Sequence, residues 1–278
     1  MSYKMQQKLV KLLMYVLLAI GVVISVYPFY WMFTASTLPD SEIFKLPPPK
    51  FPGADFIANL KALQEEMPIW RSLFNSLFVS SVTTVSTIFF ASLAGYSFAK
   101  FRFKGRDTLL FIVLLTMMLP IQISLVPLFI IMTKLSLINS YYALILPYLV
   151  TGFGVFLMRQ QLLAFPDELI ESARIDGSGE FNTFLKIVLP TMKPACAALG
   201  IVMFMQQWGN FIWPLVAVSS EDLFTLPLML SMMVEPGNVV QYGAVMVGAV
   251  IGLIPMILLF SFFQRFFVSG IFGGSVKG

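Results

Sequence analysis

Long apolar runs alternate with short polar segments along the whole chain. Six runs approach or exceed the roughly twenty residues that a helix needs to cross a bilayer core. They cover residues 12–35, 72–99, 108–133, 141–158, 195–218 and 239–264. Because proline removes a backbone donor, we expect kinks in these spans at Pro120, Pro127 and Pro255. The pattern predicts an all-α membrane protein with six transmembrane helices.

Composition supports this class and excludes several kinds of chemistry. Only 12% of the 278 residues are charged, whereas soluble proteins have about 25%. The chain has no histidine, and Cys196 is its only cysteine, so an internal disulfide or a His/Cys metal site cannot form. It also lacks a phosphate-binding GxxxxGK[ST] loop. We therefore expect no cofactor and no metal, and the dispersed net charge of +4 indicates no nucleic-acid partner.

The distribution of basic residues predicts the orientation of the spans. Six spans place both termini on one side of the membrane, and that side receives 13 of the 18 Lys and Arg residues. Because short cytoplasmic loops carry the excess of Lys and Arg, both termini are expected in the cytoplasm. The polar segment 166–194, between the fourth and fifth runs, is expected on the same side.

None of the six runs contains Asp, Glu, Lys, Arg or His. Proton relays, ion-coupled carriers and voltage sensors need ionisable groups within the membrane, so this absence disfavours those classes. A self-sufficient secondary carrier or channel stays open as the alternative, because backbone carbonyls can also coordinate an ion. A membrane enzyme would need paired carboxylates or a metal set, and the only acidic cluster, Asp167, Glu168 and Glu171, has no His or Cys beside it.

The polar segment 166–194 is predicted to form two short helices joined by a glycine. The first covers Pro166 to Asp176 and has Leu169, Ile170 and Ala173 on one apolar face. This elbow is either a surface for docking a partner protein or an amphipathic helix that rests on lipid. Its acidic character and small residues favour docking.

The turn of the elbow has its own sequence signals. Gly177 stands where a helix ends on a left-handed residue, and Asp176 is expected to cap backbone groups there. Ser178 is a suitable N-cap for a second helix over about 179–189.

The same segment resembles the EAA loop of ABC-importer permeases, in which E-A-A-x-x-D-G-A is followed by a hydrophobic stretch and x-L-P. The matching residues are Glu171, Ala173, Asp176, Gly177, Phe184, Leu189, Pro190 and Pro194. Ser172 and Ser178 replace alanines of the pattern, and both remain small.

Other stretches resemble maltose-type sugar permeases, and the resemblance covers nearly the whole chain. These stretches are "NSLFVSSVTTV", "AGYSFAKFRFKGRD", "LPIQISLVPLF", "LINSYYALILPY" and "QQWGNFIWPL". The ending "GGSVKG" is similar to the tail of the shorter subunit, which accompanies a longer permease.

This resemblance implies the type I ABC-importer permease fold in a bacterial plasma membrane. Residues 1–278 would form a single transmembrane domain: an extra N-terminal span and outer loop (1–70), a five-span core (71–270) and a cytoplasmic tail (271–278). The implied partners are a second, longer permease, an ATPase dimer, an external solute-binding protein and a sugar. The chain itself would not be an enzyme.

The resemblance also implies site residues. The residues that couple to the ATPase would be Glu171, Ser172, Ala173, Asp176, Gly177, Phe184 and Pro190. A tail reaching between the ATPase subunits would consist of Gly273, Gly274, Ser275, Val276, Lys277 and Gly278.

The most polar patch within any span consists of Gln206, Gln207, Trp208 and Asn210. Amides and an indole face suit a sugar, so this patch is a candidate for the substrate pathway. Hydrogen bonding between helices is the equally open alternative.

Overall fold

The computed structural model describes residues 3–235 and 240–272, except the side chains of Lys4 and of residues 265–272. Within these ranges every regular element is a helix, as the sequence predicts. The chain divides into two compact units, residues 1–69 with 230–253 and residues 70–229 with 254–278. The single transmembrane domain and its subdivisions remain predictions.

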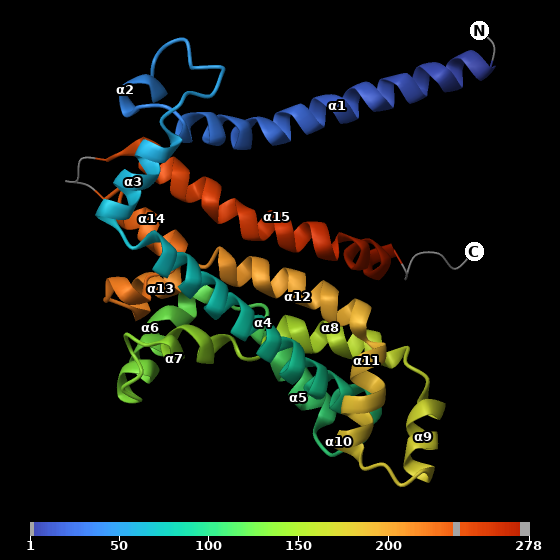
Figure 1. Cartoon of the computed structure of the whole chain (residues 1–278). Helices are drawn as coiled ribbons and strands as arrows, with labels where there is room; N and C mark the ends of the chain where they lie inside the picture. Colours follow the sequence, from blue (N-terminus) through green and yellow to red (C-terminus); the bar gives the residue numbers. More distant parts are fainter. Residues whose placement is uncertain (1–2, 236–239, 273–278) are drawn as a thin grey trace. The chain divides into compact units, whose positions relative to one another are not determined.

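The first unit contains the N-terminal helices and the beginning of the last helix (Figure 1). These elements are α1 (Tyr3–Ser36), α2 (Asp40–Ile43), α3 (Phe56–Glu66) and α15 (Tyr242–Phe272) up to residue 253. Ala35, Leu38 and Ile43 form a small buried core. The Asn59 amide fastens α3 to the end of α1, since Nδ2 donates to the carbonyl oxygens of Ser36 and Leu38 at 2.9 Å. Most apolar side chains of α1 are exposed, as suits a helix surrounded by lipid.

The second unit holds the middle of the chain. Its helices are α4 (Ile69–Lys100), α5 (Arg106–Thr116), α6 (Ile121–Lys134), α7 (Tyr141–Ile145), η1 (Leu146–Tyr148), α8 (Gly152–Leu163), α9 (Asp167–Ile175), α10 (Glu180–Thr183), η2 (Phe184–Val188), α11 (Leu189–Thr191), α12 (Lys193–Trp208), α13 (Ile212–Ala217) and η3 (Glu221–Leu223). α14 (Leu226–Met232) and α15 include residues of both units, as does α4 through its first residue, Ile69. Within the second unit, α9 lies at the opposite end from α6, α7 and α13 (Figure 1).

Three of the six predicted spans are long single helices, and three are bent helix pairs. The single helices are Met5–Ser36, Ile69–Lys100 and Tyr242–Gln264. α5 and α6 meet at 103°, and the pair Tyr141–Tyr148 with α8 bends by 40°. The fifth span, predicted over 195–218, ends at Trp208, and α12 instead pairs with Glu180–Thr191 at a bend of 80°. The described residues therefore contain up to six spans, of which three are interrupted.

The interruptions coincide with residues that end helices. Pro120 is the N-cap of α6 and has no N–H with which to continue α5. Gly209 follows α12 as its C-cap, so the predicted continuation to residue 218 was wrong. By contrast, Pro127 and Pro255 lie inside α6 and α15 without ending either helix.

Small residues let α8 approach two neighbouring helices at backbone distance. A Cβ atom added to Gly95 of α4 would lie 2.8 Å from the backbone nitrogen of Arg159 on α8. A Cβ atom added to Gly152 of α8 would lie 2.8 Å from the carbonyl oxygen of Val113 on α5. Such close approach is typical of membrane helices, which associate by packing because lipid supplies no hydrophobic driving force.

Candidate functional site

The polar segment forms the predicted elbow, and Gly177 makes its turn. Gly177 has φ = +80°, the left-handed conformation that glycine adopts without steric cost. Two backbone hydrogen bonds close the turn: Ser178 N–H donates to the Ala173 carbonyl (2.9 Å), and Gly177 N–H donates to the Arg174 carbonyl (3.0 Å). This pairing is a Schellman motif. Among the described residues the Asp176 side chain makes no hydrogen bond, so the predicted Asp176 cap was wrong.

The second helix begins one residue later than predicted. Its N-cap is Gly179, not Ser178, and the helix runs through a π-helical turn, Phe184–Val188, to Thr191. The Ser178 hydroxyl instead accepts a hydrogen bond from the Thr183 hydroxyl at 3.0 Å. The π-helical turn precedes Pro190, which cannot donate the next hydrogen bond of a regular α-helix.

The first helix, α9, buries Ile170 and Ala173 against the rest of the second unit. Ile170 belongs to the same buried cluster as Phe165 and Phe184. Phe184 is enclosed by aromatic rings, with its centroid 5.6 Å from that of Tyr96 on α4. Ala173 and Phe184 therefore hold the elbow in place from inside, where no partner protein can reach them.

Two ion pairs fix α9 to its neighbours. Lys100, at the end of α4, donates to Asp167 Oδ1 and to the Phe165 carbonyl oxygen, both at 2.6 Å. The Lys100 side chain is only 7% exposed. Burying its charged amino group without these two acceptors would cost free energy. Arg174 Nε donates to Glu180 Oε1 at 2.6 Å, and the Tyr96 hydroxyl donates to Glu180 Oε2 at 3.3 Å.

The electrostatic contribution of the Arg174–Glu180 pair is small. Its hydrogen bond to Glu180 raises the pKa of Arg174 above its ordinary value. Both side chains are exposed, however, and exposed pairs typically contribute about 0–1 kcal/mol. The pair therefore serves mainly to orient α9 on α10.

The outer face of α9 carries charge and two apolar side chains. Glu171, Ser172 and Asp176 are all exposed on it. The predicted apolar face was wrong in one respect, because Leu169 lies on this outer side and is 45% exposed. Ile175, which the sequence analysis did not single out, is 86% exposed. Pro190 is also exposed, on α11.

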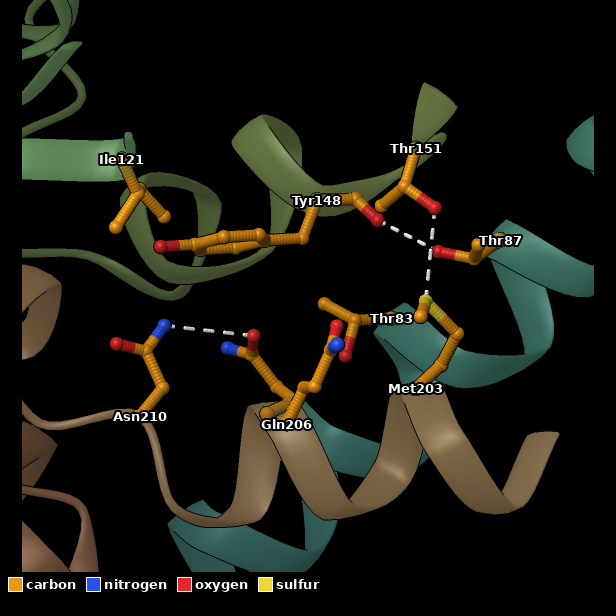
Figure 2. A pocket seen from close by; sticks show the side chains of 9 residues that line it. Thr83, Thr87, Ile121, Tyr148, Thr151, Met203, Gln206 and Asn210 are labelled. Atoms are coloured by element: carbon orange, nitrogen blue, oxygen red, sulfur yellow. Dashed lines mark hydrogen bonds between the residues drawn. The ribbon is translucent and has the colours of Figure 1, made fainter. Parts of the chain in front are cut away.

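A second feature of the same unit is a cavity of about 390 Å³ (Figure 2). Most of its surface is apolar, and we call it the polar cavity after the uncharged hydroxyl and amide side chains that line it. Its lining residues come from α4, α6, η1, α12 and the adjoining turns: Thr83, Thr87, Ile121, Tyr148, Thr151, Met203, Gln206, Gln207 and Asn210. Figure 2 shows Gln206 and Asn210 on one wall, across the cavity from Tyr148. None of the nine lining residues is charged.

The amides of the cavity retain most of their hydrogen-bonding capacity. Asn210 Nδ2 donates to Gln207 Oε1 at 3.5 Å, a long contact. In the described ranges, the Gln206 side chain makes no hydrogen bond. Three of the four predicted pathway residues thus meet at the cavity. The fourth, Trp208, is buried and stacks on Phe204 at 5.7 Å, away from the lining.

The sequence analysis missed the other wall of the cavity. Thr87 Oγ1 donates to the Tyr148 carbonyl oxygen at 2.7 Å, and Thr151 Oγ1 donates to Met203 Sδ at 3.6 Å. The spacing of Thr83 and Thr87, four residues apart on one helix face, is a signal that could have found half of this wall. Tyr148 and Thr151 lie beside the bend between η1 and α8, which the sequence did not reveal.

No metal site accompanies either feature. Across residues 3–235 and 240–272, no group of three His, Cys, Asp or Glu side chains is placed to hold a metal ion. The predicted tail residues 273–278 lie outside the described residues.

Known proteins match the chain along most of its length. The model of a family described as "Binding-protein-dependent transport system inner membrane component" matches residues 87–273. The chain is 43% identical over 210 residues to the arabinooligosaccharides transport system permease protein AraQ of Halalkalibacterium halodurans, covering 75% of each chain. It is 33% identical over 277 residues to the lactose transport system permease protein LacG of Rhizobium radiobacter, covering all of both.

Other matches extend the comparison. The chain is 33% identical over 264 residues to the sn-glycerol-3-phosphate transport system permease protein UgpE of Yersinia enterocolitica, covering 92% of this chain and 94% of the relative. A solved structure, a bacterial ABC transporter involved in the import of the acidic polysaccharide alginate, matches with a TM-score of 0.85 at 22% identity. That match covers 96% of this chain and 99% of the other. The fold is therefore that of an ABC-importer permease.

More particularly, the chain belongs to the family of binding-protein-dependent transport system inner membrane components. This confirms the family expected from the EAA-like segment and the maltose-type stretches.

Proposed function

We propose that this chain is the permease subunit of an ATP-driven sugar importer. It forms half of the translocation pathway and couples that pathway to a separate ATPase through the elbow. The observation that carries this proposal is the construction of α9. Its inner face is fixed by Ile170 and by the Lys100–Asp167 pair, while its outer face presents charged and apolar groups that no described residue covers.

The orientation predicted from the basic residues supports a cytoplasmic position of the elbow, where ATP is available. The termini, the end of α4 with its following loop, the end of α8 and the elbow share 13 of the 18 basic residues, and this excess of Lys and Arg supports a cytoplasmic position. The absence of a phosphate-binding loop in the sequence fits the same account. ATP is hydrolysed by the partner, and this chain is not itself catalytic.

Only those predicted coupling residues that are exposed contact the ATPase directly. Glu171, Ser172 and Asp176 contact the ATPase beside Leu169 and Ile175, two exposed apolar anchors. Apolar anchors within a polar rim are the usual composition of a protein interface. Gly177, Ala173 and Phe184 shape and support this surface, and Pro190 begins the return to α12.

The complete importer includes further partners. A second permease chain completes the pathway, an ATPase dimer binds the elbows, a solute-binding protein delivers substrate from outside, and the tail 273–278 reaches the ATPase. The names of two relatives, which transport arabinooligosaccharides and lactose, support a sugar as the substrate.

Co-purification from the native membrane tests this function. An N-terminal affinity tag on the wild-type chain should retain an ATPase, a second permease and a solute-binding protein. The Gly177→Asp variant should lose the ATPase and keep the second permease, because an L-residue with φ = +80° distorts the turn.

Gly179→Asp is the matched control. Gly179 has φ = −70°, and a Cβ atom there would have no neighbour within 4 Å, so this variant should keep the ATPase. The proposal is overturned if the wild-type chain purifies alone and transports solute in liposomes without ATP, which is the behaviour of a secondary carrier.

A further inference from the structure

We propose that the polar cavity binds an uncharged saccharide unit and excludes anionic substrates. The inference deepens the proposed function, because it names the chemical class of the substrate and assigns part of its site to this chain. Membership of the family leaves this class open. One relative is named for sn-glycerol-3-phosphate and another for lactose.

The charge of the cavity separates these two classes. Its nine lining residues offer hydroxyl, amide, thioether, aromatic and aliphatic groups. None of these side chains carries a charge at neutral pH. A phosphate or carboxylate within a membrane protein needs a cation or several charge-assisted hydrogen bonds to offset its desolvation. The part of the site that this chain provides supplies no such cation, so on this wall a neutral ligand is favoured over an anion.

The hydrogen-bonding groups of the cavity match sugar hydroxyls. Each hydroxyl both donates and accepts, and each amide side chain offers donors and acceptors together. Gln206 and Gln207 come from neighbouring positions of α12, and Asn210 follows the end of the helix. Their weak mutual contact, 3.5 Å between Asn210 and Gln207, leaves these groups available for a ligand.

The opposite wall supplies an apolar surface for a sugar ring. Tyr148 presents its aromatic ring across the cavity from the amides (Figure 2). The Thr87 hydroxyl bonds the Tyr148 carbonyl at 2.7 Å and so fixes the turn that carries this ring. An aromatic face opposite hydrogen-bonding amides suits a pyranose or furanose, which has both apolar faces and polar edges.

The size of the cavity is consistent with a short saccharide segment. Its volume of about 390 Å³ lies at the small end of the range for ligand sites, roughly 300–1,000 Å³. Trp208 does not take part, since it is buried against Phe204. The saccharide therefore contacts Gln206, Gln207 and Asn210 on one side and Tyr148 on the other.

Cysteine protection in membrane vesicles tests the inference on the intact complex. The chain has one native cysteine, so Cys196→Ser gives a cysteine-free background in which Gln207→Cys places a single thiol in the cavity. A membrane-permeant maleimide then labels this thiol with and without a probe. The probes are lactose, arabinotriose and other neutral oligosaccharides on one side, and sn-glycerol 3-phosphate and digalacturonate on the other.

We expect at least one neutral saccharide to slow labelling, by about tenfold at ten times its Kd, because the occupied site blocks the thiol. The anionic probes should leave the labelling rate unchanged. Gln160→Cys, exposed on α8 outside the cavity, is the matched control and should show no protection by any probe. Asn210→Cys provides a second thiol on the same wall if Gln207→Cys does not reach the membrane.

Protection by an anionic probe alone, or by no probe at either position, overturns the inference. The experiment is done without ATP, so it does not depend on coupling to an ATPase. A chain that co-purifies with its ATPase but shows protection only by an anion keeps the proposed importer function and loses the neutral-sugar site. A chain without an ATPase partner loses the proposed function, whatever the labelling shows.

Discussion

Replacement of Gly177 by alanine gives the sharpest test of how the elbow is built. Gly177 has φ = +80°, and a Cβ atom added there would have nothing within 4 Å. The substitution therefore adds backbone strain without a steric clash. Gly179, two residues later, has equal space around it but φ = −70°. Gly177→Ala and Gly179→Ala thus differ mainly in the backbone conformation that alanine must adopt.

The expected magnitude follows from the left-handed conformation. An L-residue there costs about 1–2 kcal/mol. Since each 1.4 kcal/mol corresponds to a factor of ten in an equilibrium, the opening of the turn should become about 5–30 times more favourable. In the Gly179→Ala variant the opening should instead become about 2–5 times less favourable, because the reduced chain entropy on replacing glycine favours the folded state by about 0.4–1 kcal/mol.

Hydrogen exchange measures this opening directly. The Ser178 amide donates to the Ala173 carbonyl in the closed turn, so its exchange rate reports the open fraction. With intrinsic rates corrected, Gly177→Ala should speed exchange of this amide about 5–30-fold, and Gly179→Ala should not. Equal rates in the two variants would refute the argument that positive φ, and not mere loss of glycine, governs the turn.

Three further substitutions test the packing around the elbow. Gly95→Ala should lower the free energy of unfolding in detergent by about 1–3 kcal/mol, because its Cβ meets the α8 backbone, whereas Gly21→Ala, with no neighbour within 4 Å, should not. Phe184→Ala should cost about 3–5 kcal/mol, and Phe181→Ala, at a side chain 56% exposed, clearly less; equal losses would contradict the buried aromatic cluster. Lys100→Met should weaken the attachment of α9 by about 1–3 kcal/mol, seen as faster amide exchange across α9 and contradicted by unchanged exchange.

Local signals in the sequence predicted the elements of this protein well. Apolar runs predicted the helices correctly because the bilayer core requires a similar length and an apolar surface of every span. Gly177 predicted the turn correctly because the preference of glycine for a left-handed conformation depends only on its nearest backbone atoms. Three of the four proposed pathway residues met at one cavity, since Gln206, Gln207 and Asn210 lie on neighbouring turns of one segment.

Packing between distant segments decided the features that the sequence did not predict. Leu169 and Ile170 are adjacent, and only contact with the Phe184 cluster determines that Ile170 turns inward. The sequence predicted kinks at Pro120 and Pro127 alike, and it did not predict that the chain bends by 103° at the break before α6 while α6 stays continuous through Pro127. The opposite wall of the cavity was missed for the same reason, since Tyr148 approaches α12 only in three dimensions.

The continuity of α4 has a mechanical consequence. This helix is unbroken from Ile69 to Lys100, so Thr83 in the cavity wall and Lys100, which pairs with Asp167 of the elbow, lie on one continuous helix. Their separation of 17 residues spans about 25 Å at 1.5 Å per residue. A tilt of about 5° around Lys100 displaces Thr83 by about 2 Å over this length. Such a displacement is enough to break a hydrogen bond. In the proposed coupling, α4 is therefore the continuous helix through which a movement of the elbow would shift Thr83 in the cavity wall.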